Sequence, residues 1–135
     1  MKVALDTNVI VAAFATRGLC SDLFQTLVAQ HSVLVPEPVV AELERAFAVK
    51  LRFPRNQIAQ IIGYLRDVAE ISPAVPPVAI AGLEPADAAI VSGAADAGAE
   101  AFVTGDQKVL AAGSLASMAI LSPRAMWVRL SEAQP

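Results

Sequence analysis

Short apolar runs that end at polar residues alternate with helical segments along this chain. Residues 2–5 end at Asp6, and residues 101–103 end at Thr104-Gly105-Asp106. Such runs are typical of parallel strands, which are buried on both faces because helices cover both sides of the sheet. Two further strands are expected at residues 33–35 and 118–121. The alternation of strands and helices predicts a three-layer α/β/α domain with a mainly parallel sheet.

Proline, glycine and serine mark the expected helix boundaries. Pro36 and Pro38 suit the first turn of a helix whose apolar positions have helical spacing: Val39, Leu43, Phe47 and Leu51. The other helices are expected at residues 8–14 and 19–30, from Pro54 to Val68, from Glu84-Pro85 to near Gly98, and after Ser122-Pro123. Residues 73–77 are expected to form a surface connection rather than a domain linker, because neither side could form a domain alone.

Length and composition favour one folded domain. The chain has 135 residues, of which 56% are hydrophobic, so we expect a single domain over residues 1–135 with disorder only at the last few. The single cysteine, Cys20, excludes an internal disulfide and a cysteine-based zinc cluster and favours a reducing cytoplasm. The apolar run at residues 9–15 is too short to span a bilayer, so no membrane association is expected.

Four acidic residues fall at expected strand ends or near helix starts: Asp6, Glu42, Asp87 and Asp106. Ligands of such sheets bind beyond the carboxyl ends of the strands, and carboxylates are the preferred ligands of hard divalent cations. Each acid alone also has a structural explanation. Asp6 and Asp106 each suit capping of the helix that follows, Asp87 suits a cap or first-turn position that the helix dipole stabilises, and Glu42 lies at the boundary of a buried helix face. The case for a metal site therefore depends on all four together.

Three other residues compete with these acids or lie apart from them. Glu44 is about 200° around the helix from Glu42, so only one of them can face the site, and Glu44 is expected in solvent. Glu84 is either a second candidate cap beside Asp87 or a fifth acid. The only histidine, His31, lies away from every motif and is expected to be structural or on the surface.

The motifs together resemble the PIN-domain ribonucleases, most closely the toxin branch of bacterial toxin–antitoxin systems related to VapC toxins. The resemblance is carried by Leu5-Asp6-Thr7-Asn8-Val9, the helix with Glu42, Asp87-Ala88-Ala89-Ile90 and Val103-Thr104-Gly105-Asp106. It extends from Met1 to about Leu121. It implies a five-stranded parallel sheet flanked by helices, with an acidic pocket at the carboxyl ends of the strands.

The resemblance also implies a chemistry and a set of roles. The function implied is Mg²⁺-dependent hydrolysis of RNA phosphodiester bonds, with Mn²⁺ as a second suitable metal. The implied metal ligands, direct or through water, are Asp6, Glu42, Asp87 and Asp106. Asn8 would help to hold Asp6 and a metal-bound water, and Thr104 would support Asp106. The implied protein partners are a second copy of the chain and a small antitoxin whose tail enters the site.

The charge distribution gives mixed signals about RNA. The net charge of −3 does not favour a nucleic-acid binder. However, residues 45–55 carry four cations and no acid, which is typical either of a solvated helix end or of a phosphate-binding surface. The residues expected to contact RNA phosphates are Arg17, Arg45, Lys50, Arg52 and Lys108.

Other classes of protein also place an aspartate after the first strand. A HAD-type phosphatase needs a second aspartate two residues further on, where this chain has Asn8. A receiver domain needs paired acids beside its phosphorylated aspartate and has no use for Glu42. The non-enzymatic alternative is a degenerate PIN domain that serves as a binding scaffold, and the presence of all four acids favours the enzyme.

Overall fold

The computed structural model describes residues 1–76 and 78–133, which form one six-stranded sheet with helices around it. Five strands are parallel, in the spatial order β3 (Ala69–Ser72), β2 (Ser32–Pro36), β1 (Lys2–Leu5), β4 (Ala101–Val103) and β6 (Met118–Leu121). The short strand β5 (Ser114–Leu115) pairs with β6 in the antiparallel sense. The chain runs outward from β1 through β2 to β3 and then returns to place β4 beside β1. The strand order therefore reverses between β1 and β4.

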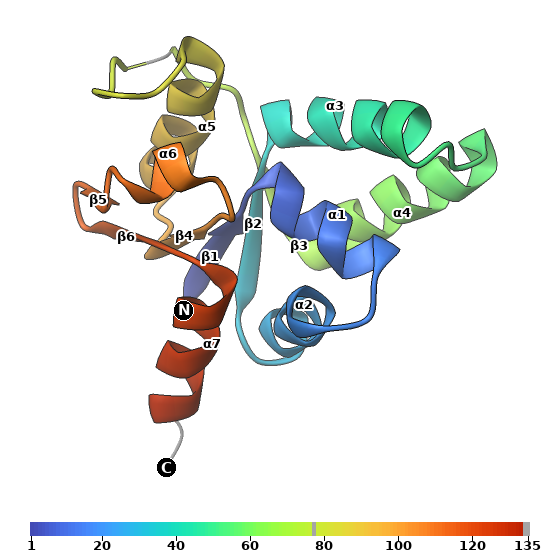
Figure 1. The fold of residues 1–135 in the computed structure, drawn as a ribbon, viewed down its shortest axis with the longest axis horizontal. Helices are drawn as coiled ribbons and strands as arrows, with labels where there is room; N and C mark the ends of the chain where they lie inside the picture. The colour runs from blue at the N-terminus through green and yellow to red at the C-terminus, as the bar shows by residue number, and fades with distance from the viewer. Residues whose placement is uncertain (77, 134–135) are drawn as a thin grey trace.

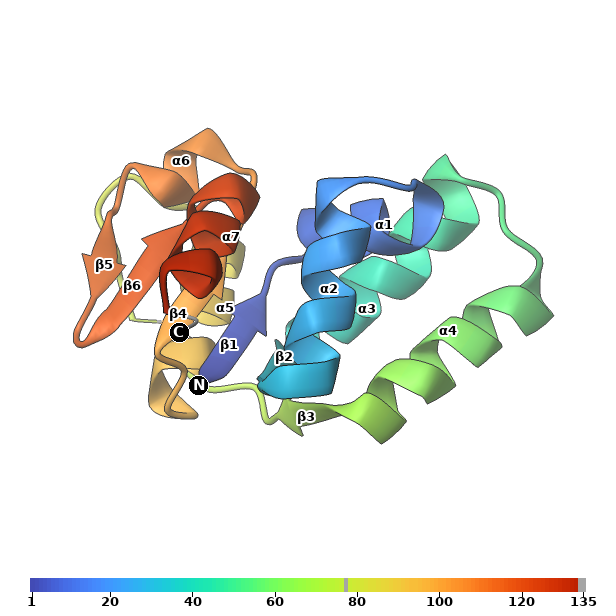
Figure 2. The same ribbon diagram turned by 90° about the horizontal axis from the view of Figure 1, so that it is seen from below.

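Helices lie on both faces of this sheet (Figures 1 and 2). They are α1 (Thr7–Ala15), α2 (Leu19–Gln30), α3 (Glu37–Arg45), α4 (Arg55–Val68), α5 (Pro85–Asp96), α6 (Gln107–Leu110) and α7 (Pro123–Glu132), with a π-helical segment η1 (Ala46–Lys50) directly after α3. Figure 2 shows α2 and α7 on one face and α5 on the opposite face. In Figure 1, α3 and α4 project together away from the sheet on the right. The three-layer α/β/α class with a mainly parallel sheet is thus confirmed.

The core explains why the strand sequences are apolar without alternation. Val3, Ala4 and Leu5 of β1 are fully buried, as are Leu34 and Val35 of β2. Central parallel strands are covered on both faces, so neither side of β1 can carry polar residues until the strand ends at Asp6. Among the residues that the structure describes, no helix is long and apolar enough to cross a membrane.

Two strands were not expected from the apolar pattern, and the five-stranded sheet is corrected to six strands. β3 has the sequence Ala-Glu-Ile-Ser and lies at the sheet edge, where Glu70 is exposed, so it shows no apolar run. It also follows α4 without an intervening turn residue. β5 is only two residues long and exists through its pairing with β6.

The helix that begins after Pro36 does not continue as an α-helix to Leu51, as its spacing predicted. It becomes π-helical at Ala46, and the amide of Leu51 donates to the carbonyl oxygen of Ala46 at 3.2 Å. The wider π turn changes the angular spacing of the side chains. Phe47 therefore stays fully buried, whereas Leu51 is 36% exposed.

The other expected helices are present with small differences at their ends. Ser122 caps α7 by accepting a hydrogen bond from the amide of Ala125 at 3.1 Å. Gly98, with φ of 87°, follows the end of α5 in the left-handed region that favours glycine. Of the expected surface connection, Pro77 lies outside the described residues, as do Gln134 and Pro135 of the expected disordered end.

Candidate active site

The carboxyl ends of β1 and β4 meet at the point where the strand order reverses, and Asp6 lies there. Its amide donates to the carbonyl oxygen of Val103 at 2.9 Å, which joins the ends of the two strands. Its Oδ1 accepts from the amide of Thr7 at 2.9 Å and caps α1. This is the crevice in which open parallel sheets bind ligands. The capping explanation for Asp6 is therefore correct for one carboxylate oxygen, and the second oxygen points to other partners.

Thr104 links the two aspartates of the strand ends. Its hydroxyl donates to Oδ2 of Asp6 at 2.7 Å and accepts from the amide of Asp106 at 3.0 Å. Its own amide donates to the carbonyl oxygen of Leu121 at 3.0 Å, so β6 also fixes its position. The side chain is fully buried, and a buried hydroxyl with its partners satisfied holds one geometry.

The side chain of Asn8 connects the motif at residues 5–9 to the motif at residues 103–106 through hydrogen bonds. Its Oδ1 accepts from the amide of Gly105 at 2.8 Å, and its Nδ2 donates to Oδ2 of Asp6 at 3.3 Å. A Cβ atom at position 105 would lie 3.3 Å from Oδ1 of Asn8, which is tighter than ordinary contact. The glycine between Thr104 and Asp106 therefore allows this approach, a role that the sequence motif contains but that we did not predict.

Glu42 reaches the same edge from α3. The Thr7 hydroxyl donates to Oε1 of Glu42 across the gap between α1 and α3. Thr7 follows Asp6 directly in the first motif, and this position is the only signal in the sequence that points to it. Glu42 is half-buried, whereas Glu44 is exposed, so the helix separates the two acids as expected.

Asp87 and Asp106 complete the acidic edge from two other helices. Asp106 caps α6, with Oδ1 accepting from the amide of Lys108 at 2.9 Å. Asp87 lies in the first turn of α5, where no side-chain capping bond is made by the preceding Glu84. Both Asp87 and Asp106 line the same cleft as Asp6 and Glu42.

The acids influence one another electrostatically. Burial raises the pKa of Asp6, hydrogen bonds from Thr104 and Thr7 partly lower it again, and the charges of Glu42 and Asp87 raise it further. Burial also raises the pKa of Asp87, followed by the charges of Asp106, Glu42 and Glu84, with Lys108 acting in the opposite direction. Carboxylates gathered at short range destabilise one another's charged forms, and a cation between them would relieve this repulsion.

The cleft that contains these acids has a volume of about 790 Å³. Of the residues expected to contact RNA, Arg45 and Lys50 line it. Lys108 is exposed on α6 and close enough to Asp87 to lower its pKa. Arg17 lies in the turn after α1 and Arg52 follows η1, and neither is among the described residues that line the cleft.

The chemistry of the acidic edge suits a hard divalent cation, but the side chains are not closed around one. Carboxylate oxygens are the preferred ligands of Mg²⁺, which also retains several waters in most protein sites. Within residues 1–76 and 78–133, no three acidic, histidine or cysteine side chains form a ready-made metal site. The donor types therefore fit, and a cation at this edge would be held partly through water.

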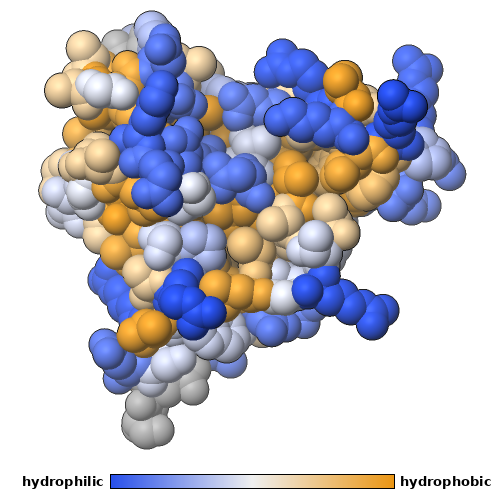
Figure 3. All heavy atoms as spheres, in the orientation of Figure 1, coloured by the Kyte–Doolittle hydropathy of each residue, from blue (hydrophilic) through white to orange (hydrophobic). Residues whose placement is uncertain are grey.

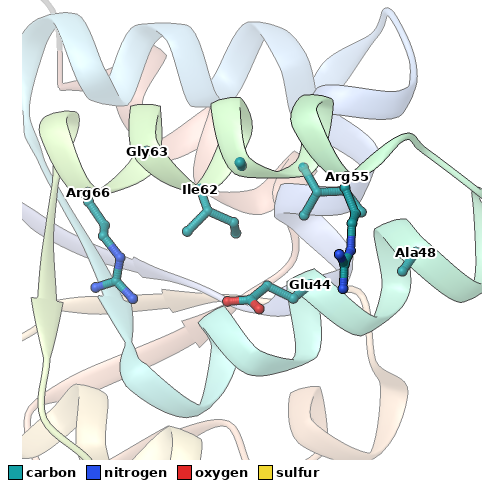
Figure 4. A pocket seen from close by; sticks show the side chains of 8 residues that line it. Glu44, Ala48, Arg55, Ile62, Gly63 and Arg66 are labelled. Carbon is teal, nitrogen blue, oxygen red and sulfur yellow. The ribbon is translucent and has the colours of Figure 1, made fainter.

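A second cavity lies between α3 and α4 and has quite different walls (Figure 4). This groove, of about 700 Å³, contains Glu44, Arg55 and Arg66 around the apolar side chains of Ile58 and Ile62. Arg66 forms an exposed ion pair with Glu37 at 3.4 Å. Glu44 thus faces a different surface from Glu42.

Comparison with known proteins identifies the family. Residues 3–114 match the PIN domain, so this chain belongs to the PIN domain family, which confirms the resemblance drawn from the motifs. No curated protein sequence matches the chain.

Solved structures share the fold at low sequence identity. PAE2754 from Pyrobaculum aerophilum is 16% identical with a TM-score of 0.68, over 98% of this chain and 90% of that one. VapBC2 from Rickettsia felis, bound to a DNA fragment from the promoter, is 16% identical with a TM-score of 0.64, over 90% and 98%. FitAcB from Neisseria gonorrhoeae is 21% identical with a TM-score of 0.63, over 90% and 98%.

Proposed function

We propose that this protein is a Mg²⁺-dependent endoribonuclease and the toxin of a toxin–antitoxin pair. The observation that carries the proposal is the gathering of Asp6, Glu42, Asp87 and Asp106 from four separate elements at the edge where β1 and β4 end. A structural need for capping would account for Asp6 and Asp106 singly. It does not account for the gathering of further acids, whose charges add to burial in raising the pKa of Asp6 and of Asp87.

The proposed roles combine the metal ligands that the family resemblance implies with the hydrogen bonds that orient Asp6. Asp6, Asp87 and Asp106 would hold the Mg²⁺ or Mn²⁺ ion, and Glu42 would act directly or through water. When bound there, the ion would supply Lewis-acid stabilisation of the charge on the phosphate and would make a bound water more acidic. Thr104 and Asn8 keep the second oxygen of Asp6 in a fixed direction, which matters because pre-oriented groups need no rearrangement during the reaction.

The direct test is metal-dependent cleavage of total RNA and of a defined single-stranded RNA by the wild-type protein, Asp6→Asn and Asp106→Asn. We expect cleavage by the wild type in Mg²⁺ and loss of nearly all of it in both variants. Cleavage that is equal in all three proteins would contradict the catalytic proposal. RNA binding without cleavage would instead support the alternative, a degenerate PIN domain that acts as a scaffold.

The proposed partners are an RNA substrate, a cognate antitoxin and a second copy of the chain. The antitoxin proposal is supported by the family membership and by the fold shared with VapBC2 and FitAcB. It predicts that expression of this chain alone slows growth and that a short neighbouring reading frame encodes a binding protein that restores growth. Harmless expression, or the absence of such a frame, would contradict it. The dimer is tested by the mass of the purified protein in light scattering.

A further inference from the structure

Aromatic side chains gather around the last turn of α1, at the opposite end of this helix from Asp6. Five rings contact one another: Phe14, Phe24, Phe47, Phe53 and Tyr64. They come from α1, α2, η1, the connection between η1 and α4, and α4 itself. Because aromatic residues make up only 5% of the chain, this concentration requires an explanation. We call these five residues the aromatic cluster.

Phe14 of α1 has the central ring of the aromatic cluster. Its centroid lies 5.3 Å from that of Phe24, 6.5 Å from that of Phe47 and 6.2 Å from that of Tyr64. All three contacts are edge-to-face, with interplanar angles of 62°, 87° and 78°, an arrangement that aromatic rings favour at these distances. The last turn of α1 is therefore held by rings from three other helical segments.

The helix α1 is attached to α3 and η1 at both of its ends. At its first residue the Thr7 hydroxyl donates to Oε1 of Glu42, and near its last residue the ring of Phe14 contacts that of Phe47. Thr7 and Phe14 are two turns apart, about 10 Å along the axis, so they lie on the same face of the helix. Since η1 directly follows α3, two contacts fix the angle between the helices as well as their separation.

The rest of α1 provides fewer restraints on its orientation. Only Val9 and Ile10 of this helix are buried, and both belong to the main core. In Figure 3, hydrophobic atoms lie at the surface over α1, so solvent covers part of the helix. One hydrogen bond at Thr7 would fix a distance to α3 but not the direction of the helix. The ring contacts at the other end supply the second restraint.

We propose that the aromatic cluster positions the carboxylate of Glu42, with Phe14 and Tyr64 as positioning residues. Their rings hold α1 against η1 and thereby keep the Thr7 hydroxyl on Glu42. The proposal rests on the metal-binding role proposed for Glu42 and adds residues that act through it. Tyr64 is 44% exposed, so filling the core does not explain a ring at this position. Groups that orient the ligands of a metal strongly affect its affinity.

The test is a double-mutant cycle in which the affinity for Mn²⁺ is measured from the electron paramagnetic resonance signal of the free ion. Tyr64→Leu removes the ring and keeps an apolar side chain, and it is made in the wild type and in Glu42→Gln. Tyr64→Phe keeps the ring and is the matched control. Val128→Ala controls for the loss of apolar surface, because Val128 on α7 is also 44% exposed.

We expect Tyr64→Leu to weaken Mn²⁺ binding about tenfold in the wild type, the lower end of what loss of an orienting group costs a metal site. Phe14→Leu should act in the same way, and both control variants should bind Mn²⁺ as the wild type does. In the Glu42→Gln protein, Tyr64→Leu should cause no further loss, because its effect passes through Glu42.

A purely structural role would give a different pattern. Equal losses of Mn²⁺ affinity in the wild type and in Glu42→Gln would overturn the proposal. Unchanged affinity in either folded ring variant, Tyr64→Leu or Phe14→Leu, would also overturn it. Circular dichroism shows whether each variant is folded. If Phe14→Leu does not fold, Tyr64→Leu decides the question, because the exposed side chain of Tyr64 is not part of the buried core.

This proposal and the proposed function fail in distinguishable ways. If the wild-type protein binds Mn²⁺ and cleaves RNA but the cycle shows equal losses, only the positioning role is wrong. If Glu42→Gln binds Mn²⁺ as tightly as the wild type, Glu42 is not a ligand, and the positioning role is overturned while cleavage through the other acids stands. If the wild-type protein neither binds Mn²⁺ nor cleaves RNA, both proposals are wrong.

Discussion

Two cavities of similar size, the cleft and the groove, differ in the kind of residues that line them. The cleft at the ends of β1 and β4 has a volume of about 790 Å³, and the groove between α3 and α4 about 700 Å³. In the cleft, Thr104, Asn8 and Thr7 hold the carboxylates of Asp6 and Glu42 in fixed directions. In the groove, exposed side chains of both charges surround an apolar floor.

The difference shows that volume alone does not identify a reactive site. Acids at the cleft are partly buried and repel one another, which is an arrangement that folding alone does not favour. The oppositely charged groups at the groove are exposed to solvent, and exposed ion pairs contribute little to stability. We therefore propose the cleft, and not the groove, as the place of the chemistry.

Removal of the divalent metal should have the largest effect. Treatment with EDTA is expected to abolish RNA cleavage, because the acids alone provide no positive charge to stabilise the phosphate. Mg²⁺ or Mn²⁺ added in excess should restore it. Initial rates from gel-resolved, end-labelled RNA give the measurement, and a rate unchanged by EDTA would place the activity outside the acidic cleft.

Thr104→Val should destabilise the protein and the site together. The substitution keeps the shape but removes the hydroxyl that serves Asp6 and the amide of Asp106. Leaving such partners unsatisfied typically costs about 1–3 kcal/mol of unfolding free energy. Thr104→Ser, which keeps the hydroxyl, is the matched control. Urea denaturation that gives equal stabilities for Val and Ser at this position would contradict the role assigned to the hydroxyl.

Asp87→Asn should stabilise the metal-free protein at neutral pH. The pKa of Asp87 in the folded protein is raised above its ordinary value of 3.8, so the charged form is disfavoured by folding. The stability associated with the bound proton is therefore fully present below pH 3.8 and is lost as the pH rises through the folded-state pKa. In EDTA at pH 7.5 the asparagine variant should unfold at a higher temperature than the wild type.

The gain from Asp87→Asn should shrink as the pH falls toward 4, and Mg²⁺ should raise the Tm of the wild type more than that of the variant. Asp67→Asn, on the exposed surface of α4, is the control and should show neither effect. A lower Tm for the Asp87 variant in EDTA at pH 7.5 would show that its charge stabilises the fold.

Arg66→Ala in the groove should have the smallest effect. The ion pair with Glu37 joins two side chains that are each 48% exposed, so its loss should change the unfolding free energy by less than about 1 kcal/mol. RNA cleavage should be unchanged. A large loss of cleavage at normal stability would mean that the groove takes part in the reaction.

The sequence predicted the parts of the fold that depend on continuous apolar runs. β1, β2, β4 and β6 were recognised because central parallel strands cannot alternate polar and apolar residues. β3 was missed because an edge strand tolerates Glu70. The prediction that the helix after Pro36 continues to Leu51 was wrong. The choice between an α turn and a π turn there depends on how Phe47 packs against Phe53, which the sequence does not show.

The placement of the candidate site could be inferred only where sheet geometry determines it. Asp6 and Asp106 follow neighbouring strands, so their proximity follows from the order of the sheet. The bond between Thr7 and Glu42 could not be foreseen, because it depends on the distance between α1 and α3. The packing of the helices also decides which cations line the cleft. The sequence therefore could not show that Arg45 and Lys50 line it whereas Arg17 and Arg52 do not.

The most direct measurement compares the same chemical change at the two cavities. Asp106→Asn in the cleft and Glu44→Gln in the groove each convert one carboxylate to an amide, and both side chains are accessible from solvent. Initial rates of cleavage of one end-labelled single-stranded RNA in Mg²⁺ would be determined for both variants and the wild type. Our account predicts a loss of about 10²-fold or more for Asp106→Asn, the scale on which single stabilising groups contribute, and a wild-type rate for Glu44→Gln. Equal rates in the two variants would contradict the assignment of the chemistry to the acidic cleft.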